Sequence, residues 1–287
     1  MADRNGEFDE WVSAHRHELL VHCYRMLGSL TDAEDVLQET LLAAWRGLDG
    51  FAGRSSPRTW LYRIATNRCL NFVRRLPPEP VPPFEPPPPT RRNEVVWLQP
   101  LPDPDTWSSS RESVELAFIV ALQHLPPRQT AALVLRDVLD FSAAEVASML
   151  DTSETAVKGL LQRARAALRY RPTPVSADPD LVQRFASAFM ANDIPRVVDL
   201  LTDDAWLAMP PAPHEYHGRA AIAAFLRARG NRPLRLVPAR ANGQPAFGCY
   251  LEDSPAGVLV LTMASGGVAG VTRFLDVDPD RYLVYAD

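Results

Sequence analysis

A proline-rich segment divides this chain of 287 residues into two parts. Residues 76–104 contain twelve of the 27 prolines, including the run from Pro86 to Pro89. Proline fixes φ and has no backbone N–H donor, so such a segment forms neither a helix nor a central strand. We therefore expect a linker of extended polyproline II, semi-rigid and solvated.

The composition is that of a globular protein and excludes several other classes. The length suggests two or three domains at roughly 100–200 residues each. A net charge of -5 argues against a surface that binds polyanions everywhere, so any nucleic-acid site is local. Cys23, Cys69 and Cys249 are widely spaced, which excludes a disulfide framework and argues against zinc, and we expect no metal or other cofactor. The sequence has no signal peptide and no run of ~18 apolar residues, so we expect a cytoplasmic protein without a membrane partner.

The stretch from Phe51 to Arg75 concentrates positive charge, with six arginines and no acid. Aromatic side chains and asparagines are interleaved with this charge: Trp60, Tyr62, Phe72, Asn67 and Asn71. Arginine neutralises phosphates, aromatic faces stack on unpaired bases and asparagine reads base edges, a combination that favours nucleic-acid binding. A solvated basic helix is the alternative, because basic runs often have no such role.

The segment before this stretch is acidic. We expect a helix from Trp11 to Leu27, then a second helix opened by a capping box of Thr31 and Glu34. Its predicted buried face comprises Ala33, Leu37, Leu41, Trp45 and Leu48. An acidic helix face beside an arginine-rich helix favours separate surfaces for a basic protein partner and for DNA. An ordinary amphipathic helix is the alternative.

Residues of about 11–75 resemble region 2 of the bacterial sigma-70 family, in its extracytoplasmic-function (ECF) subfamily. The resemblance lies in GSLTDAEDVLQETLLAAW and FAGRSSPRTWLYRIATNRCLNFVRR. It implies that Asp35, Gln38 and Glu39 face the clamp of the largest subunit of core RNA polymerase. It also implies contacts to the −10 promoter element by Arg54, Ser55, Ser56, Arg58, Trp60, Asn67, Arg68, Asn71 and Arg74. Ala52 replaces the basic residue often found at its position.

A second helical block extends from Ser113 to Tyr170. Ser142 and Glu145 form a predicted capping box, Asp151 to Ser153 a turn, and Glu154 to Arg169 a longer helix, the pattern of a helix-turn-helix. The longer helix is basic apart from Glu154, which is consistent with entry into the major groove. A three-helix unit without a DNA role is the alternative.

This block resembles region 4 of the same family, through LPPRQTAALVLRDVLDFSAAEVASMLDTSETAVKGLLQRARAAL. The resemblance implies reading of the −35 element, with Ser153, Glu154, Thr155 and Lys158 at base edges and Arg163 and Arg165 on the backbone. It also implies contact with the flap of the second-largest polymerase subunit. Leu160 stands where many relatives have arginine. Regions 2 and 4 in this order predict a sigma factor that initiates transcription and is not an enzyme.

The rest of the chain has helices first and strands afterwards, the pattern of an α+β fold. Expected helices begin near Leu181 and Ile194 and cover Arg219 to Arg229, and expected strands cover 205–209, 234–242, 246–251, 257–264 and 270–277. Residues 214–218 are expected to form a loop. LLTDDAWLAMPP and YHGRAAIAAFL resemble the SnoaL-like branch of the nuclear-transport-factor-2 superfamily, which implies a cone around a pocket.

The expected pocket lining consists of Trp206, Met209, His214, His217, Phe225 and Phe274. By spacing, His214 and His217 have no obvious carboxylate partner, which favours a regulatory domain over an enzyme. The resemblance to ECF groups that have such a C-terminal domain implies a regulatory contact between this domain and the sigma regions. Trp97 and Leu98 of the linker and the glycine pair Gly266 and Gly267 would take part in it. An isomerase- or cyclase-like enzyme or a ligand sensor, with a small-molecule ligand, stays open as the alternative.

We therefore expect a multi-domain chain, with two all-α domains and a C-terminal α+β cone. The predicted boundaries are 8–76 for region 2, 77–110 for the linker, 111–171 for the region 4 helix-turn-helix and 178–287 for the SnoaL-like domain.

Overall fold

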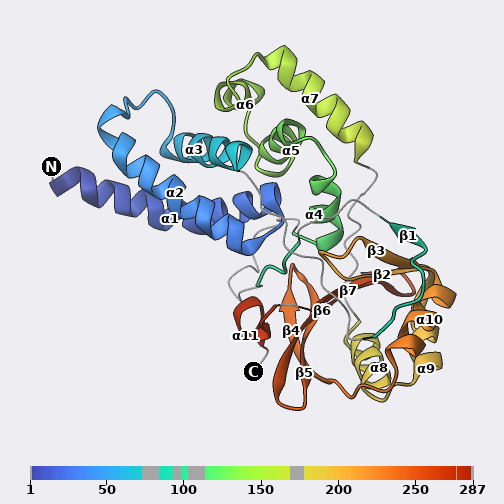
Figure 1. Cartoon of the computed structure of the whole chain (residues 1–287). Coiled ribbons are helices and arrows are strands. Elements are labelled where there is room, and N and C mark those ends of the chain that lie inside the picture. The colour runs from blue at the N-terminus through green and yellow to red at the C-terminus, as the bar shows by residue number, and fades with distance from the viewer. Residues whose placement is uncertain are drawn as a thin grey trace. The chain divides into compact units, whose positions relative to one another are not determined.

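A computed structural model describes residues 2–72, 84–92, 98–102, 114–168, 178–275 and 277–285. The chain divides into two compact units (Figure 1). Unit 1 combines residues 1–75 with 118–171, and unit 2 combines residues 76–117 with 172–287. The segment between the two helical blocks therefore groups with the C-terminal part of the chain.

Three long helices form the first part of unit 1: α1 (Ala2–Leu27), α2 (Leu30–Gly47) and α3 (Pro57–Asn71), with a 3-10 turn at Leu48–Gly50. Two details of α2 differ from the expectation. The N-cap is Ser29, whose Oγ accepts from Asp32 N at 3.1 Å, and not Thr31. Trp45 is exposed, because the buried positions Ala33, Val36 and Ala44 set a face that leaves Trp45 on the other side.

The second part of unit 1 contains α4 (Leu116–Gln123), which begins in unit 2, then α5 (Pro127–Leu133), a π-helical segment (Val134–Val138), α6 (Ala143–Met149) and α7 (Glu154–Ala167). The predicted capping box at the start of α6 is confirmed in both directions. Ser142 Oγ accepts from Glu145 N, and Glu145 Oε2 accepts from Ser142 N at 2.9 Å. α6 and α7 form the helix-turn-helix visible in Figure 1.

Unit 2 is built on one sheet of strand order β1-β3-β2-β7-β6-β5-β4-β8. The strands are β1 (Arg91–Arg92), β2 (Leu201–Ala208), β3 (His214–His217), β4 (Arg235–Ala241), β5 (Gln244–Leu251), β6 (Ser254–Ala264), β7 (Gly267–Phe274) and β8 (Val284–Tyr285). Only β2 and β7 pair in parallel among these neighbours. Residues 214–217, predicted as a loop, form strand β3, because β1 and β2 both pair with them.

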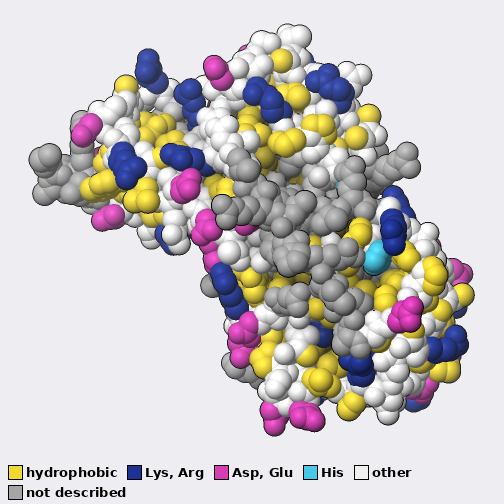
Figure 2. Space-filling view, in the orientation of Figure 1, with side chains coloured by type: hydrophobic (Ala, Val, Ile, Leu, Met, Phe, Trp, Pro, Cys, Tyr) yellow, Lys and Arg dark blue, Asp and Glu magenta, His cyan; other side chains and the backbone are white. Residues whose placement is uncertain are grey.

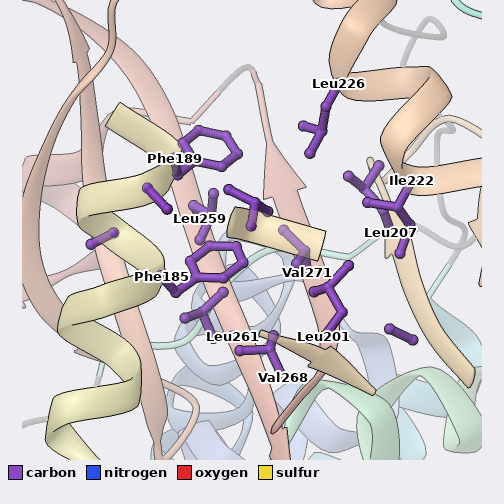
Figure 3. Packing of buried hydrophobic residues seen from close by; sticks show 14 of the residues in the cluster. Phe185, Phe189, Leu201, Leu207, Ile222, Leu226, Leu259, Leu261, Val268 and Val271 are labelled. Atoms are coloured by element: carbon purple, nitrogen blue, oxygen red, sulfur yellow. The ribbon is translucent and has the colours of Figure 1, made fainter. Parts of the chain in front are cut away.

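The helices of unit 2 are α8 (Pro179–Met190), α9 (Ile194–Asp199), α10 (Arg219–Arg229) and α11 (Pro279–Tyr282). Figure 3 shows Phe185 and Phe189 of α8 and Leu226 of α10 extending toward the apolar side chains of the strands. Burial of these aromatic and aliphatic groups is the main stabilising term of the unit. This arrangement confirms the predicted α+β cone.

The linker is less solvated than its proline content predicts. Leu98, Gln99 and Leu101 are buried. Residues Arg91 and Arg92 pair with β3 as an edge strand, and Tyr216 Oη donates to Pro87 O at 2.9 Å. An unpaired sheet edge presents free N–H and C=O groups, and an extended segment satisfies them.

Candidate functional site

The exposed side of α3 and the loop before it carry most of the −10 candidates. Arg54, Ser55, Ser56, Asn67, Arg68 and Asn71 are exposed, and Trp60 is half-buried. Ser56 also caps α3, since its Oγ accepts from Thr59 N at 3.0 Å. Trp60, Asn67 and Asn71 recur at helical spacing and so share one face. Tyr62, which the sequence places among the base-stacking aromatics, is fully buried, and Arg74 lies outside the described residues.

Arg58 has a different environment from the other −10 candidates. Its guanidinium carbon lies 5.0 Å from the ring centre of Tyr62 and 4.4 Å from that of Phe141, and its Nε lies 3.5 Å from Glu18 Oε2. Next to it, Thr59 Oγ1 donates to Glu145 Oε1 at 2.9 Å. We call the group of Arg58, Thr59, Tyr62, Phe141 and Glu145 the α3–α6 contact.

Glu145 belongs to both the capping box and the α3–α6 contact. Hydrogen bonds from the backbone and side chain of Ser142 lower the pKa of its carboxyl group, and Thr59 and Arg58 act in the same direction. Glu145 is therefore charged at neutral pH.

The polymerase candidates share the exposed face of α2. Asp35, Gln38 and Glu39 are exposed there, together with the large apolar side chains Leu42 and Trp45. Glu39 Oε2 lies 3.2 Å from Arg68 Nη1 on α3. The acidic and basic surfaces predicted from the sequence therefore adjoin. Figure 2 shows exposed basic side chains at several points over the helices of this unit.

The recognition helix α7 presents all six −35 candidates to solvent: Ser153, Glu154, Thr155, Lys158, Arg163 and Arg165. Ser153 is its N-cap, with Oγ accepting from Ala156 N at 3.2 Å. Arg165 differs from the rest because it forms a bidentate ion pair with Asp137, at 2.6 Å for Nη2–Oδ1 and 2.8 Å for Nε–Oδ2. Hydrogen bonding to Asp137 raises the pKa of Arg165. A phosphate contact by Arg165 must therefore compete with Asp137.

Two buried amides of unit 2 bind the backbone of the linker and of the start of α4. Asn242 Oδ1 accepts from Leu101 N at 2.8 Å, and its Nδ2 donates to Val114 O at 2.7 Å. Gln244 Oε1 accepts from Leu116 N at 2.9 Å. These are side-chain to backbone bonds, so they recognise the path of the linker rather than its sequence.

A cavity of about 160 Å³ lies in unit 2. Met209 and Phe225 line it, as do linker residue Phe84 and the arginines Arg229, Arg232 and Arg273. Trp206, His214, His217 and Phe274 are not among its lining residues. Side chains alternate along a strand, so the lining residues Val271 and Arg273 face opposite to Phe274. Leu207 likewise faces opposite to Trp206, whose ring lies against Gly270.

The expectation that the two histidines lack a carboxylate partner is wrong for His217. Its Nε2 lies 2.7 Å from Glu215 Oε2, because residues two apart on strand β3 lie on the same face. The backbone N–H of His217 donates to Thr90 Oγ1 of the linker at 2.7 Å. The pair therefore lies where the linker joins the sheet.

The remaining regulatory candidates are partly described. Gly266, at φ 96, lies in the turn between β6 and β7, and Gly267 is the first residue of β7. A Cβ on Gly267 would lie 2.8 Å from Leu200 O, so that position requires glycine. Leu98 is buried, and Trp97 lies outside the described residues.

In the described part of the chain, no group of three or more His, Cys, Asp or Glu could hold a metal ion. No helix of those residues has the length and apolar character needed to cross a membrane.

Family models match all three parts of the chain. Sigma-70 region 2 matches residues 11–76, sigma-70 region 4 matches residues 115–168, and a SnoaL-like domain matches residues 182–246. These matches include α2 and α3, the helix-turn-helix, and the part of unit 2 from α8 to the start of β5.

Individual relatives agree with the family models. The chain is 46% identical over 305 residues to the ECF RNA polymerase sigma factor SigG of Mycobacterium tuberculosis, covering 96% of this chain and 82% of SigG. It is 34% identical to SigJ of the same organism, covering 69% of this chain and 63% of SigJ. The crystal structure of SigJ has the same fold, with a TM-score of 0.68 at 24% identity over 94% of this chain and 96% of that one. The chain therefore belongs to the ECF sigma factors of bacterial RNA polymerase, with a SnoaL-like domain at its C-terminal end.

Proposed function

We propose that this ECF sigma factor binds core RNA polymerase through the exposed face of α2 and reads promoter DNA through α3 and α7. The single observation that carries the proposal is the exposure, in one unit, of an acidic helix face, a basic helix face and a basic recognition helix. We further propose that it acts in the cytoplasm, where bacterial transcription takes place.

The α2 surface suits a basic protein partner. Asp35, Gln38 and Glu39 supply charge and hydrogen-bond acceptors, and Leu42 and Trp45 supply exposed apolar area beside them. Interface energy concentrates in large side chains such as tryptophan surrounded by polar groups. We assign this surface to the clamp of the largest polymerase subunit, and we assign region 4 to the flap of the second-largest subunit.

The −10 surface suits single-stranded DNA. Opening a strand costs a few kcal/mol per unstacked base, which stacking and phosphate contacts must offset. Arg54, Ser55 and Ser56 form an exposed loop that could surround a flipped base, and Asn67 and Asn71 continue the surface along α3. The −35 surface suits duplex DNA, with Lys158 and Arg163 on the open side of α7.

The α3–α6 contact corresponds to an inactive arrangement of these surfaces. The −35 and −10 elements are separate sites along the promoter, and B-form DNA rises about 3.4 Å for each base pair between them. Helices joined by the 2.9 Å bond between Thr59 and Glu145 cannot meet both elements at once. We infer that polymerase binding separates them.

The C-terminal domain regulates the factor in this proposal, and it does so through the linker. Asn242 binds the backbone of Leu101 in the linker and of Val114 at the start of the region 4 segment, Gln244 binds the backbone of Leu116 at the start of α4, and β3 pairs with linker residues Arg91 and Arg92. A restrained linker limits how far regions 2 and 4 can separate. Sigma factors are not enzymes, and we propose that the C-terminal domain performs no turnover.

Binding assays with charge-reversal variants test the assignment of surfaces. Glu39→Arg should weaken binding to bacterial core polymerase at least tenfold and leave binding to a −35 duplex unchanged. Arg163→Glu should weaken binding to the −35 duplex and leave binding to core polymerase unchanged. Glu252→Arg, at an exposed position in unit 2, should change neither binding affinity. The assignment would be contradicted if Glu39→Arg and Arg163→Glu each lost both kinds of binding, or if neither variant lost any.

An enzyme or ligand sensor fused to a regulatory half is the second candidate. The cavity in unit 2 favours the sensor form of this alternative. The enzyme form requires an acid or base at the cavity, and the His217–Glu215 pair is not among its lining residues.

A further inference from the structure

The cavity of unit 2 combines an apolar wall with positive charge. Its lining includes Phe189, Leu207, Phe225, Leu226, Leu259 and Val271, and also three arginines, Arg229, Arg232 and Arg273. In Figure 3, Phe189 of α8 and Leu226 of α10 approach the strand residues Leu207, Leu259 and Val271 from two sides. Cavities that bind only neutral apolar molecules do not need guanidinium groups in their walls.

Two N–H groups of the Arg229 guanidinium have no hydrogen-bond acceptor among the described residues. Its Nε and Nη1 are buried and make no hydrogen bond to the described residues. Its Nη2 makes one long contact to Asn192 Oδ1 at 3.4 Å, and its guanidinium lies 4.6 Å from the ring centre of Phe189. Unsatisfied buried donors on a charged group are costly, and native proteins retain them where a ligand or ion supplies the acceptor.

Arg273 adds a second uncompensated charge. Its Nη1 donates to Val258 O at 3.1 Å and to Phe274 O at 2.8 Å, and its Nη2 donates to Ala256 O. These carbonyl bonds fix the guanidinium in place but leave its charge unpaired. Neither arginine has a carboxylate partner among the described residues, since the charges that act on them are Cys249 and other arginines. Burial, followed by the charge of Arg273, lowers the pKa of Arg229.

The size of the cavity limits the ligand. A cavity of 150 Å³ holds one benzene ring, so about 160 Å³ admits one six-membered ring or an acyl chain of similar volume. Guanidinium groups bind carboxylates through paired N–H···O bonds. We propose that the cavity binds a monocarboxylate with a compact apolar body, its carboxylate at Arg229 and its apolar part against Phe189, Leu226 and Val271.

Occupancy of this site would act on the linker. Phe84, from the linker, lines the cavity and lies 5.4 Å from the ring of Phe225, and Arg232 lies 6.0 Å from the ring centre of Phe84. A ligand in the cavity therefore touches the segment that joins region 2 to region 4. The effect of the ligand on the linker rests on the proposed regulatory function, whereas binding of a carboxylate in the cavity does not.

The test compares three one-ring probes on the full-length chain: benzoate, benzamide and benzylammonium. Calorimetric titration should give an affinity for the acid at least tenfold above that for the amide, with no binding of the cation. Equal affinity for acid and amide, or no binding of the acid, would overturn the proposal. Failure of the promoter-binding assays with acid binding intact would leave this site standing, so the two failures are distinguishable.

Variants locate the carboxylate. Arg229→Met removes the charge and should abolish the preference for the acid, and Arg229→Lys should retain a part of it. Arg227→Met, on the exposed side of the same helix, is the matched control and should bind like the wild type. If Arg229→Met does not fold, Ala256→Phe, which fills the cavity, should abolish binding of the acid. Retention of the acid preference in either Arg229→Met or Ala256→Phe would overturn the proposal.

Discussion

The guanidinium carbon of Arg58 lies 4.4 Å from the centre of the Phe141 ring, which joins α3 of region 2 to the segment before α6 of region 4. Arg58 is a candidate for contact with promoter DNA, so the contact that stabilises unit 1 also covers part of the −10 surface. A DNA contact by Arg58, as we propose it, therefore requires the α3–α6 contact to open.

Phe141→Leu should increase the fraction of molecules in which regions 2 and 4 are apart. The change keeps an apolar side chain but removes the aromatic face over which Arg58 lies, a loss of about 0.5–2 kcal/mol. Distance distributions between spin labels at Ala52 and Gln162, both exposed, would measure the shift. Phe8→Leu, which alters an aromatic contact with Trp45 elsewhere in unit 1, is the control. An unchanged distribution in Phe141→Leu would show that the contact does not hold the regions together.

The stability of unit 1 should fall as the pH decreases from 7 to 5. Burial, with the charges of Arg25 and Arg58, lowers the pKa of His22 to about 3. In the unfolded chain the pKa is about 6.5, so between the two values the unfolded state binds more protons and acid favours it, by about 2 kcal/mol at pH 5. Hydrogen exchange of α1 and α3 amides, corrected for intrinsic rates, would measure this change.

His22→Gln isolates the contribution of the imidazole. Glutamine keeps a polar group within reach of Thr66 Oγ1, which lies 2.9 Å from His22 Nε2, but does not titrate. The variant should show a smaller pH dependence than the wild type. An identical pH dependence would assign the effect to other groups.

Local sequence patterns predicted much of this fold. The Ser142–Glu145 capping box, the turn that follows α6 and the basic face of α7 depend on residues within a few positions of one another. Short-range hydrogen bonding and helical periodicity decide such features, so the sequence contains them directly.

Features that depend on long-range pairing were missed. The linker contains many prolines, yet Leu101 is buried because Asn242, 141 residues away, accepts its N–H. The sequence does contain a signal for the two cavity arginines, because each lies at an apolar position of its element. Arg273 alternates with Val271 and Leu275 on one strand face, and Arg229 follows Phe225 by one helical turn, so both lie on apolar faces.

Asp137→Asn should strengthen binding of the protein to a −35 duplex several-fold. The change breaks the bidentate ion pair that occupies Arg165, which then becomes available to a phosphate. The salt dependence of binding should steepen by about one counterion. Asp140→Asn removes the same charge three residues away without an ion pair to Arg165 and is the control. Equal gains in both variants would indicate a general charge effect and not the release of Arg165.

Asn242→Gly should loosen the linker on unit 2. Asn242 has φ 56, which glycine adopts readily, so the change removes two buried hydrogen bonds with little backbone strain. A loss of about 1–3 kcal/mol per unsatisfied partner predicts faster hydrogen exchange in residues 98–102. Glu252→Gly, at an exposed position with φ 56, should leave this exchange unchanged. Unaltered protection in Asn242→Gly would mean that other contacts hold the linker.

Run-off transcription with bacterial core polymerase tests the central claim most directly. The template is a genomic fragment pool that includes the upstream region of the protein's own gene, and the proteins compared are the wild type, Glu39→Arg and Asn242→Gly. We predict initiation at defined sites only with the wild type or Asn242→Gly present, at a rate that differs between them, and none above background with Glu39→Arg. Absence of protein-dependent initiation with the wild type, together with absence of core polymerase binding, would contradict the account.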